Sequence, residues 1–139
     1  MDAPHARKLL LAQHAAIRTQ LDHCRGIAQR VRHGETAEAE LEAALERLRD
    51  AFSTHNLSES SLIRPLLIGA ASWGDQLLER MIDEHLAEHI AMWEAMGRPA
   101  LVLATQLDEL AEELDAHMSA EERTFLAVLD PGVIERHRE

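Results

Sequence analysis

The chain has 139 residues, 46% hydrophobic and 28% charged, a balance that predicts one globular domain over residues 1–139 and argues against disorder. Its 14 basic and 25 acidic side chains give a formal net charge of −11, which repels nucleic acids and anionic lipids, so we expect neither as a partner. No apolar run approaches the roughly 18 residues of a membrane span, and a single cysteine, Cys24, which cannot form an internal disulfide, favours a cytoplasmic location.

Helix breakers divide the chain into four apolar-periodic stretches of about 25 to 32 residues that lack strand-like alternation, so all four are predicted to be helices. The first helix is expected to begin near Ala3, to hold Pro4 in its first turn and to end before Gly34. The second is expected to follow this glycine and to continue to about Ile68.

The third helix is expected to begin near Ser72, where Ser72 and Asp75 have the spacing of a capping box. The fourth is expected to hold Pro99 in its first turn and to end near Asp130. Short connections make consecutive helices antiparallel neighbours, and the predicted fold is therefore an all-α, up-down-up-down antiparallel four-helix bundle.

In each stretch the apolar residues recur at alternating spacings of three and four, which places them on one seam that faces the bundle axis. Five histidines and two glutamates occupy the same seam: His14, His55, Glu59, His85, His89, His117 and Glu121. Counted from a common end of the bundle at 1.5 Å per residue, these positions span roughly 12 Å of the axis. The sequence therefore predicts one polar layer in the middle of the bundle.

A spacing of i, i+4 places two side chains on one helix face, where both can reach the same ion or adjacent ions. Three pairs have this spacing: His55 with Glu59, His85 with His89, and His117 with Glu121. Buried without partners, each ionised group would cost several kcal/mol. Metal ions supply such partners, and the donors are too many for one six-coordinate ion but suit two ions bridged by the carboxylates. Imidazole and carboxylate without thiolate suit iron, manganese or zinc.

The order of motifs is specific: a histidine on the first helix, HxxxE on the second, HxxxH on the third and HxxxE on the fourth. With the flanking segments QHAAIRTQL, HNLSESSLIRPLL and HMSAEERTFLAVL, it resembles the hemerythrin-like, or HHE cation-binding, domain over nearly the whole chain. The resemblance implies a non-haem centre of two iron ions with an oxo or hydroxo bridge. By the same resemblance one iron is held by His85, His89 and His117, the other by His14 and His55, and both by Glu59 and Glu121.

The second iron would then be one ligand short of six, which leaves a position for dioxygen or a related small molecule. The chain departs from the oxygen-carrying branch of that family in its last carboxylate, which there is an Asp five residues after the histidine. Here Glu121 lies at +4 and Glu122 at +5 from His117, and the seam selects Glu121. Polar Asn56 replaces the carriers' bulky pocket residue and suits long-lived storage of dioxygen less well. The remaining expected pocket residues are apolar: Ile17, Leu114 and Met118.

The function expected from the resemblance is binding of dioxygen, nitric oxide or peroxide at the di-iron centre. Two alternatives stay open: a peroxide-decomposing (catalase-like) or nitric-oxide-handling enzyme, and an iron-responsive or iron-storage module. Manganese in place of iron, and occupancy of a single metal site, also stay open. The absence of tyrosine argues against tyrosyl-radical chemistry. Cys24 lies ten residues from His14, too far along the helix to be a ligand of the same ion.

Overall fold

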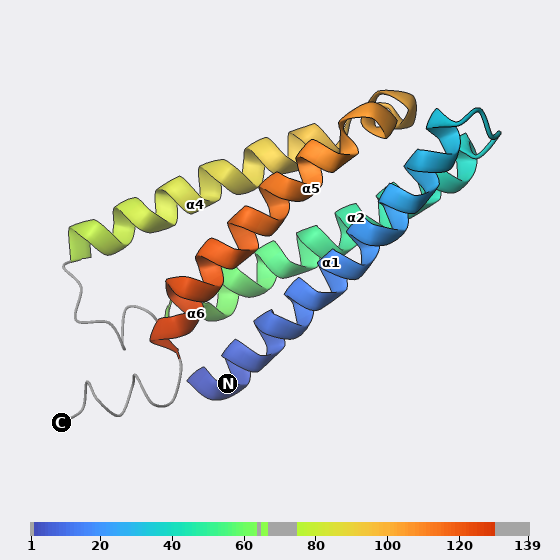
Figure 1. Cartoon of the computed structure of the whole chain (residues 1–139). Helices are drawn as coiled ribbons and strands as arrows, with labels where there is room; N and C mark the ends of the chain where they lie inside the picture. The colour runs from blue at the N-terminus through green and yellow to red at the C-terminus, as the bar shows by residue number, and fades with distance from the viewer. Residues whose placement is uncertain (1, 64, 67–74, 130–139) are drawn as a thin grey trace.

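The structure, a computed structural model, describes residues 2–63, 65–66 and 75–129. The described helices are α1 (Ala3–Arg32), α2 (Glu38–Ser58), the π-helix η1 (Glu59–Ile63), α4 (Asp75–Met96), α5 (Ala100–Arg123) and the short α6 (Phe125–Val128). α1, α2, α4 and α5 run alternately up and down, and the turns that join α1 to α2 and α4 to α5 lie at the same end (Figure 1). The predicted antiparallel four-helix bundle is confirmed.

The limits of α1 follow from its sequence. Asp2 caps the helix, since its side chain accepts a hydrogen bond from the His5 backbone N–H at 2.9 Å, and Pro4 lies in the first turn. The helix ends at Arg32, and Gly34 adopts a φ of 91°, a left-handed conformation that favours glycine. The predicted start near Ala3 and the end before Gly34 are therefore confirmed.

The second helix departs from the prediction, which had one regular helix continuing to about Ile68. α2 ends at Ser58, and the chain continues as the π-helix η1 from Glu59. At this junction the Glu59 N–H contacts the carbonyls of both His55 and Asn56, so the hydrogen-bond pattern changes where the chain approaches the polar layer. The predicted capping box of Ser72 and Asp75 lies outside the described residues.

The fourth helix also differs from the prediction. Pro99 is the N-cap of α5 and not part of its first turn, and the helix breaks at Thr124 before reaching Asp130. Thr124 has a φ of −109° and a ψ of −86°, and its hydroxyl donates to the carbonyl of Ala120 at 2.7 Å. After this residue the chain continues as the separate short helix α6.

Two apolar clusters fill the bundle at different levels. The larger cluster lies toward the turns and includes Leu48, Leu107 and Leu114, all fully buried. The smaller lies toward the start of α1 and contains Leu10 and Leu126. The predicted polar layer falls between the two clusters, since His14 follows Leu10 on α1 and His117 follows Leu114 on α5. Its polar groups are therefore shielded by hydrocarbon above and below.

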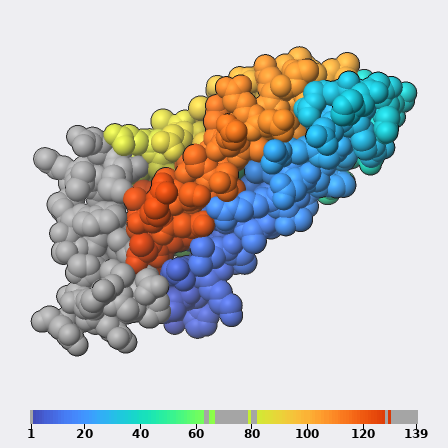
Figure 2. All heavy atoms as spheres, viewed as in Figure 1, coloured from blue at the N-terminus to red at the C-terminus, as the bar shows by residue number. Residues whose placement is uncertain are grey.

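The bundle is elongated, and α1, α5 and α4 lie side by side on the face shown in Figure 2. α1 and α4 each pack against both α2 and α5. Among the described residues, no helix is both long and apolar enough to cross a membrane.

Candidate metal centre

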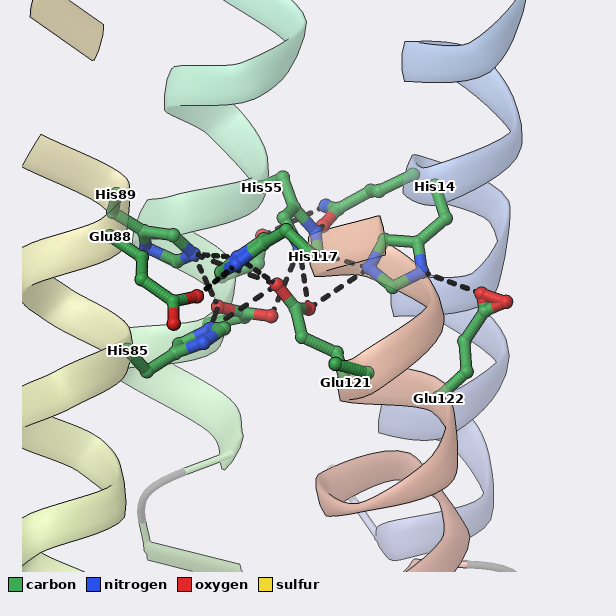
Figure 3. Close-up of polar contacts among 12 residues, drawn as sticks. His14, His55, His85, Glu88, His89, His117, Glu121 and Glu122 are labelled. Carbon is green, nitrogen blue, oxygen red and sulfur yellow. Dashed lines mark hydrogen bonds and ion pairs between the residues drawn. The ribbon is translucent and has the colours of Figure 1, made fainter. Parts of the chain in front are cut away.

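The seven side chains singled out on the seam converge between the helices (Figure 3). α1, α2 and η1 contribute His14, His55 and Glu59 in turn; α4 contributes His85 and His89, and α5 contributes His117 and Glu121. All are buried except His85, whose side chain is 16% exposed. The structure brings all seven together, and their role as metal ligands stays a prediction.

The first group consists of His85, His89, His117 and Glu121, whose nitrogen and oxygen donors all lie within 4.8 Å of one another. The Nε2 atoms of His89 and His117 are 2.8 Å apart. Glu121 Oε1 lies 2.6 Å from His117 Nε2 and 3.2 Å from His85 Nε2. Three imidazoles and a carboxylate oxygen thus face a common point, in a pattern that suits one metal ion.

The second group consists of His14, His55, Glu59 and Glu121, with donors again within 4.8 Å of one another. The Nε2 atoms of His14 and His55 are 3.1 Å apart. Glu121 Oε2 lies 3.0 Å from the first of these nitrogens and 3.1 Å from the second. Two imidazoles and two carboxylates thus face a second point next to the first, in a pattern that suits a second cation.

Both glutamates reach both groups. Glu121 presents Oε1 to His117 at 2.6 Å and Oε2 to His14 at 3.0 Å. Glu59 presents Oε1 to His55 at 3.0 Å and Oε2 to His85 at 2.6 Å. Each carboxylate therefore offers one oxygen to each group, as a carboxylate that bridges two cations must do.

Three of the five histidines have a side-chain oxygen within hydrogen-bond distance of Nδ1, the ring nitrogen that faces away from the centre. His14 Nδ1 lies 3.2 Å from Glu122 Oε2, and His117 Nδ1 lies 2.7 Å from Glu88 Oε2. His55 Nδ1 lies 3.0 Å from the amide oxygen of Gln13. An acceptor at Nδ1 favours the ring form with a proton on Nδ1, and in that form the lone pair of Nε2 is available to a metal at the centre.

The spacing of seam residues did not predict Gln13 and Glu88 as partners of the histidines, and it indicated Glu122 only as an alternative metal ligand to Glu121. Each is next to a seam residue in sequence, but each contacts a histidine on another helix. Gln13 on α1 contacts His55 on α2, Glu88 on α4 contacts His117 on α5, and Glu122 on α5 contacts His14 on α1. The sequence offered one signal for these acceptors, their position next to a seam residue. Which histidine each acceptor contacts depends on how the helices are rotated about their axes.

The donor chemistry fits bound cations. Two imidazole nitrogens at 2.8 Å or 3.1 Å, with their lone pairs facing, need a cation or a proton between them. Glu121 Oε1 is buried and makes no hydrogen bond within the described part of the chain, although it faces imidazole nitrogens. Cations in the two groups would satisfy all of these atoms.

In the metal-free fold, protons on the histidines have to compensate the charge of the buried glutamates. Burial works against protonation of His55, but contacts with Glu121 and Glu59 outweigh it and raise the pKa to about 9. The same opposing causes raise the pKa of His85 to about 10, whereas burial lowers the pKa of His89. Burial also opposes ionisation of Glu121, yet hydrogen bonding to Glu59 and the imidazoles holds its pKa well below its usual range.

A groove of about 200 Å³ opens between α4 and α5 beside the first group. It is lined by Glu84, His85, Glu88, His117, Ala120, Glu121, Thr124 and Phe125. None of the expected pocket residues Ile17, Leu114 and Met118 lines it, and all three are buried in the larger apolar cluster.

Two further residues of the sequence analysis lie outside the two donor groups. Asn56 is partly exposed, and its buried Oδ1 makes no hydrogen bond within the described ranges. Cys24 is fully buried in the larger apolar cluster, where burial raises the pKa of its thiol to about 11. A neutral, buried thiol in this position belongs to the hydrophobic core.

Comparison with known proteins agrees with this geometry. The family model described as the hemerythrin HHE cation binding domain matches residues 5–129, a range that includes both donor groups and all three outer acceptors. Searches of curated proteins and of solved structures found no significant match. The matched range covers most of the 139 residues, so the resemblance noted in the sequence is confirmed. The chain belongs to the hemerythrin HHE cation-binding domain family.

Proposed function

We propose that this cation-binding protein is a non-haem di-iron protein that binds dioxygen or a related small molecule, nitric oxide or hydrogen peroxide. One iron would be held by the first group and the other by the second, with Glu59 and Glu121 shared. Nitrogen and oxygen donors without thiolate suit iron, and membership of a cation-binding family supports a metal in this place.

The observation that carries the proposal is the position of the two shared carboxylates, each of which offers one oxygen to each group. Counting both carboxylates, the first group has five donors and the second has four. With an oxo or hydroxo bridge these counts would be six and five, so an ion held by His14 and His55 would have one position for an exogenous ligand. A pair of ferrous ions bound there would supply two electrons to such a ligand.

Other residues of the chain orient the histidine ligands and limit the access of water to them. Gln13, Glu88 and Glu122 hold the outer nitrogens of three histidines and so fix the direction of their donor atoms. Phe52 lies against the His89 ring, with centroids 5.6 Å apart, and Phe125 lies against His85 at 5.2 Å. Each histidine of α4 therefore has one phenylalanine ring against it, which limits the access of water from that side.

A second candidate is an enzyme that decomposes peroxide or transforms nitric oxide. The groove between α4 and α5 favours it, because His85 at its wall is 16% exposed and a polar reactant in water can reach this side of the centre. Turnover requires reactant and product to exchange with solvent, and this opening provides a path for that exchange.

Metal analysis combined with visible spectroscopy tests the proposal. We expect two irons per chain, and an absorption band that appears with oxygen and disappears on degassing. Evolution of oxygen from added peroxide, in proportion to iron content, would select the enzyme. His55→Ala should abolish either signal. The matched control is His23→Ala, since His23 is an exposed histidine of α1 outside both groups. A purified chain that holds no metal after iron loading would refute the proposal.

A further inference from the structure

The groove between α4 and α5 connects solvent to the first donor group. At its outer rim are Glu84 and Glu88 of α4, both exposed, and at its inner wall are His117 and Glu121 of α5, both buried. His85, at 16% exposure, lies between these two levels. The groove is therefore a path along which donor atoms become progressively less accessible to water.

We propose that this groove is the route by which divalent metal cations reach the buried centre, with Glu84 and Glu88 as the residues that attract them. This inference rests on the proposed metal centre and adds to it the path of loading. It assigns to Glu88 a second role beside its contact with His117, and it assigns a role to Glu84, which is not a member of either donor group.

Dehydration is the physical obstacle that such a path has to overcome. A divalent cation gives up its waters only as other donors replace them, and a bare charge in hydrocarbon is very costly. Along the groove the ion would meet an exposed carboxylate, Glu88 at 58% exposure, then the part-exposed imidazole of His85. It would finally meet Glu121 Oε1, which is buried and without a hydrogen bond in the described structure. Each step offers a donor before the next water is lost.

The charge of the wall also favours cations. Among the described residues, the ionisable side chains that line this groove are three glutamates and two histidines, with no lysine or arginine. By contrast, a larger groove of about 510 Å³ at the end near the turns has two arginines, Arg49 and Arg98, beside its two glutamates, and contains no residue of either donor group. A wall whose net charge is negative concentrates cations and speeds their association.

The first test blocks the groove sterically. Ala120 lies on the exposed side of α5 and lines the groove, so Ala120→Phe adds a ring there without changing the buried core. Ala116, one turn earlier on α5 and also exposed, does not line the groove, and Ala116→Phe is the matched control. The probe is Co²⁺ alone, mixed with the chelator-stripped full chain in a stopped-flow spectrometer.

We expect Ala120→Phe to slow Co²⁺ uptake by about tenfold or more, with the same final cobalt content per chain as the unaltered protein. Ala116→Phe should leave the rate unchanged. Equal uptake rates in the two variants would overturn the proposed route while leaving the metal centre in place. If the unaltered chain took up no Co²⁺ and no Fe²⁺, both the route and the proposed function would fail, so the two failures are distinguishable.

The second test removes charge from the rim. Glu84→Gln and Glu88→Gln should each lower the uptake rate about two- to tenfold and weaken its dependence on ionic strength, because attraction by the wall is screened by salt. Glu88→Gln keeps an oxygen that can accept from His117. Glu94→Gln is the control, since Glu94 is exposed on α4 but does not line the groove. Unchanged rates and salt dependence in both rim variants would contradict the assignment of Glu84 and Glu88.

Discussion

Glu121 and Glu122 contact opposite ring nitrogens of the same histidine. Glu121 Oε2 lies 3.0 Å from His14 Nε2, and Glu122 Oε2 lies 3.2 Å from His14 Nδ1. Consecutive helical residues diverge by about 100° around the axis, and so one carboxylate faces the centre while the other stays near the surface. There Glu122 also accepts a hydrogen bond from Arg18 Nη2 at 3.2 Å. Two adjacent glutamates therefore have different roles.

Replacing each of these glutamates by glutamine should separate the roles. Glu121→Gln removes the charge of a carboxylate shared by both donor groups, so we expect fewer than two metals per chain after dialysis. Glu122→Gln keeps an acceptor for His14 and should retain both metals, with affinity lowered by at most about 10- to 100-fold. Metal content measured by elemental analysis tests this, and equal metal loss in the two variants would contradict it.

Gln13 is expected to act through His55. Its amide oxygen accepts from His55 Nδ1 at 3.0 Å, and its amide nitrogen donates to Ser58 Oγ at 2.8 Å. Gln13→Leu removes both bonds and should weaken metal binding by about 10- to 100-fold, since the orientation of His55 is then less restricted. Competition titration against a coloured chelator measures the affinity.

Gln29→Leu is the control for this substitution, because Gln29 is exposed on α1 outside the donor groups. It should bind metal as tightly as the unaltered protein. A Gln13→Leu variant with unchanged affinity would show that the amide does not orient His55.

Metal binding and the stability of the metal-free protein should change with pH in opposite directions. The pKa values of His55 and His85 rise from 6.5 to about 9 and about 10 in the metal-free fold, because Glu121 and Glu59 favour the protonated forms over the opposing effect of burial. Their stabilisation is fully present below about pH 6.5 and is lost as the pH rises through 9 and 10. The melting temperature of the chelated protein should therefore fall over this range.

A metal has to displace the same two protons, so its affinity should rise over that range, by up to about 100-fold per pH unit. Calorimetric titration in buffers of different ionisation enthalpy counts the protons released. A metal affinity that does not vary between pH 6.5 and 9 would show that His55 and His85 are neutral before binding.

Core packing should matter independently of the metal. Leu107 is fully buried in the larger apolar cluster, and Leu107→Ala should lower the free energy of unfolding by about 2–5 kcal/mol, both with and without metal. Leu101, also on α5, is 53% exposed, and Leu101→Ala should change it by less than about 0.5 kcal/mol. Denaturant unfolding measures both values, and metal content should stay the same.

Cys24 should behave as a core residue. Its thiol is fully buried and burial raises its pKa to about 11, so little thiolate is present at neutral pH. A thiol reagent should label the folded protein slowly and the denatured protein fast. Rapid labelling of the folded chain would show that α1 opens around Cys24.

Local sequence predicted both limits of α1 but not the breaks in the second and fourth helices. Asp2, Pro4 and Gly34 mark the ends of α1 by chemistry that acts over a few residues. The π-helix at Glu59 and the break at Thr124 occur where the chain passes the polar layer. No propensity of the individual residues distinguishes these positions from a regular helix.

The sequence by itself determined the fold class and the seven seam residues, because a spacing of three and four places side chains on one helix face in any bundle. Only the tertiary structure decided which residues meet across helices: Gln13 with His55, Glu88 with His117, Glu122 with His14. It also decided where the groove between α4 and α5 opens. The contacts between helices and the position of the groove depend on the rotation and offset of each helix about its axis. Packing of the whole bundle, and not any local pattern, sets this rotation and offset.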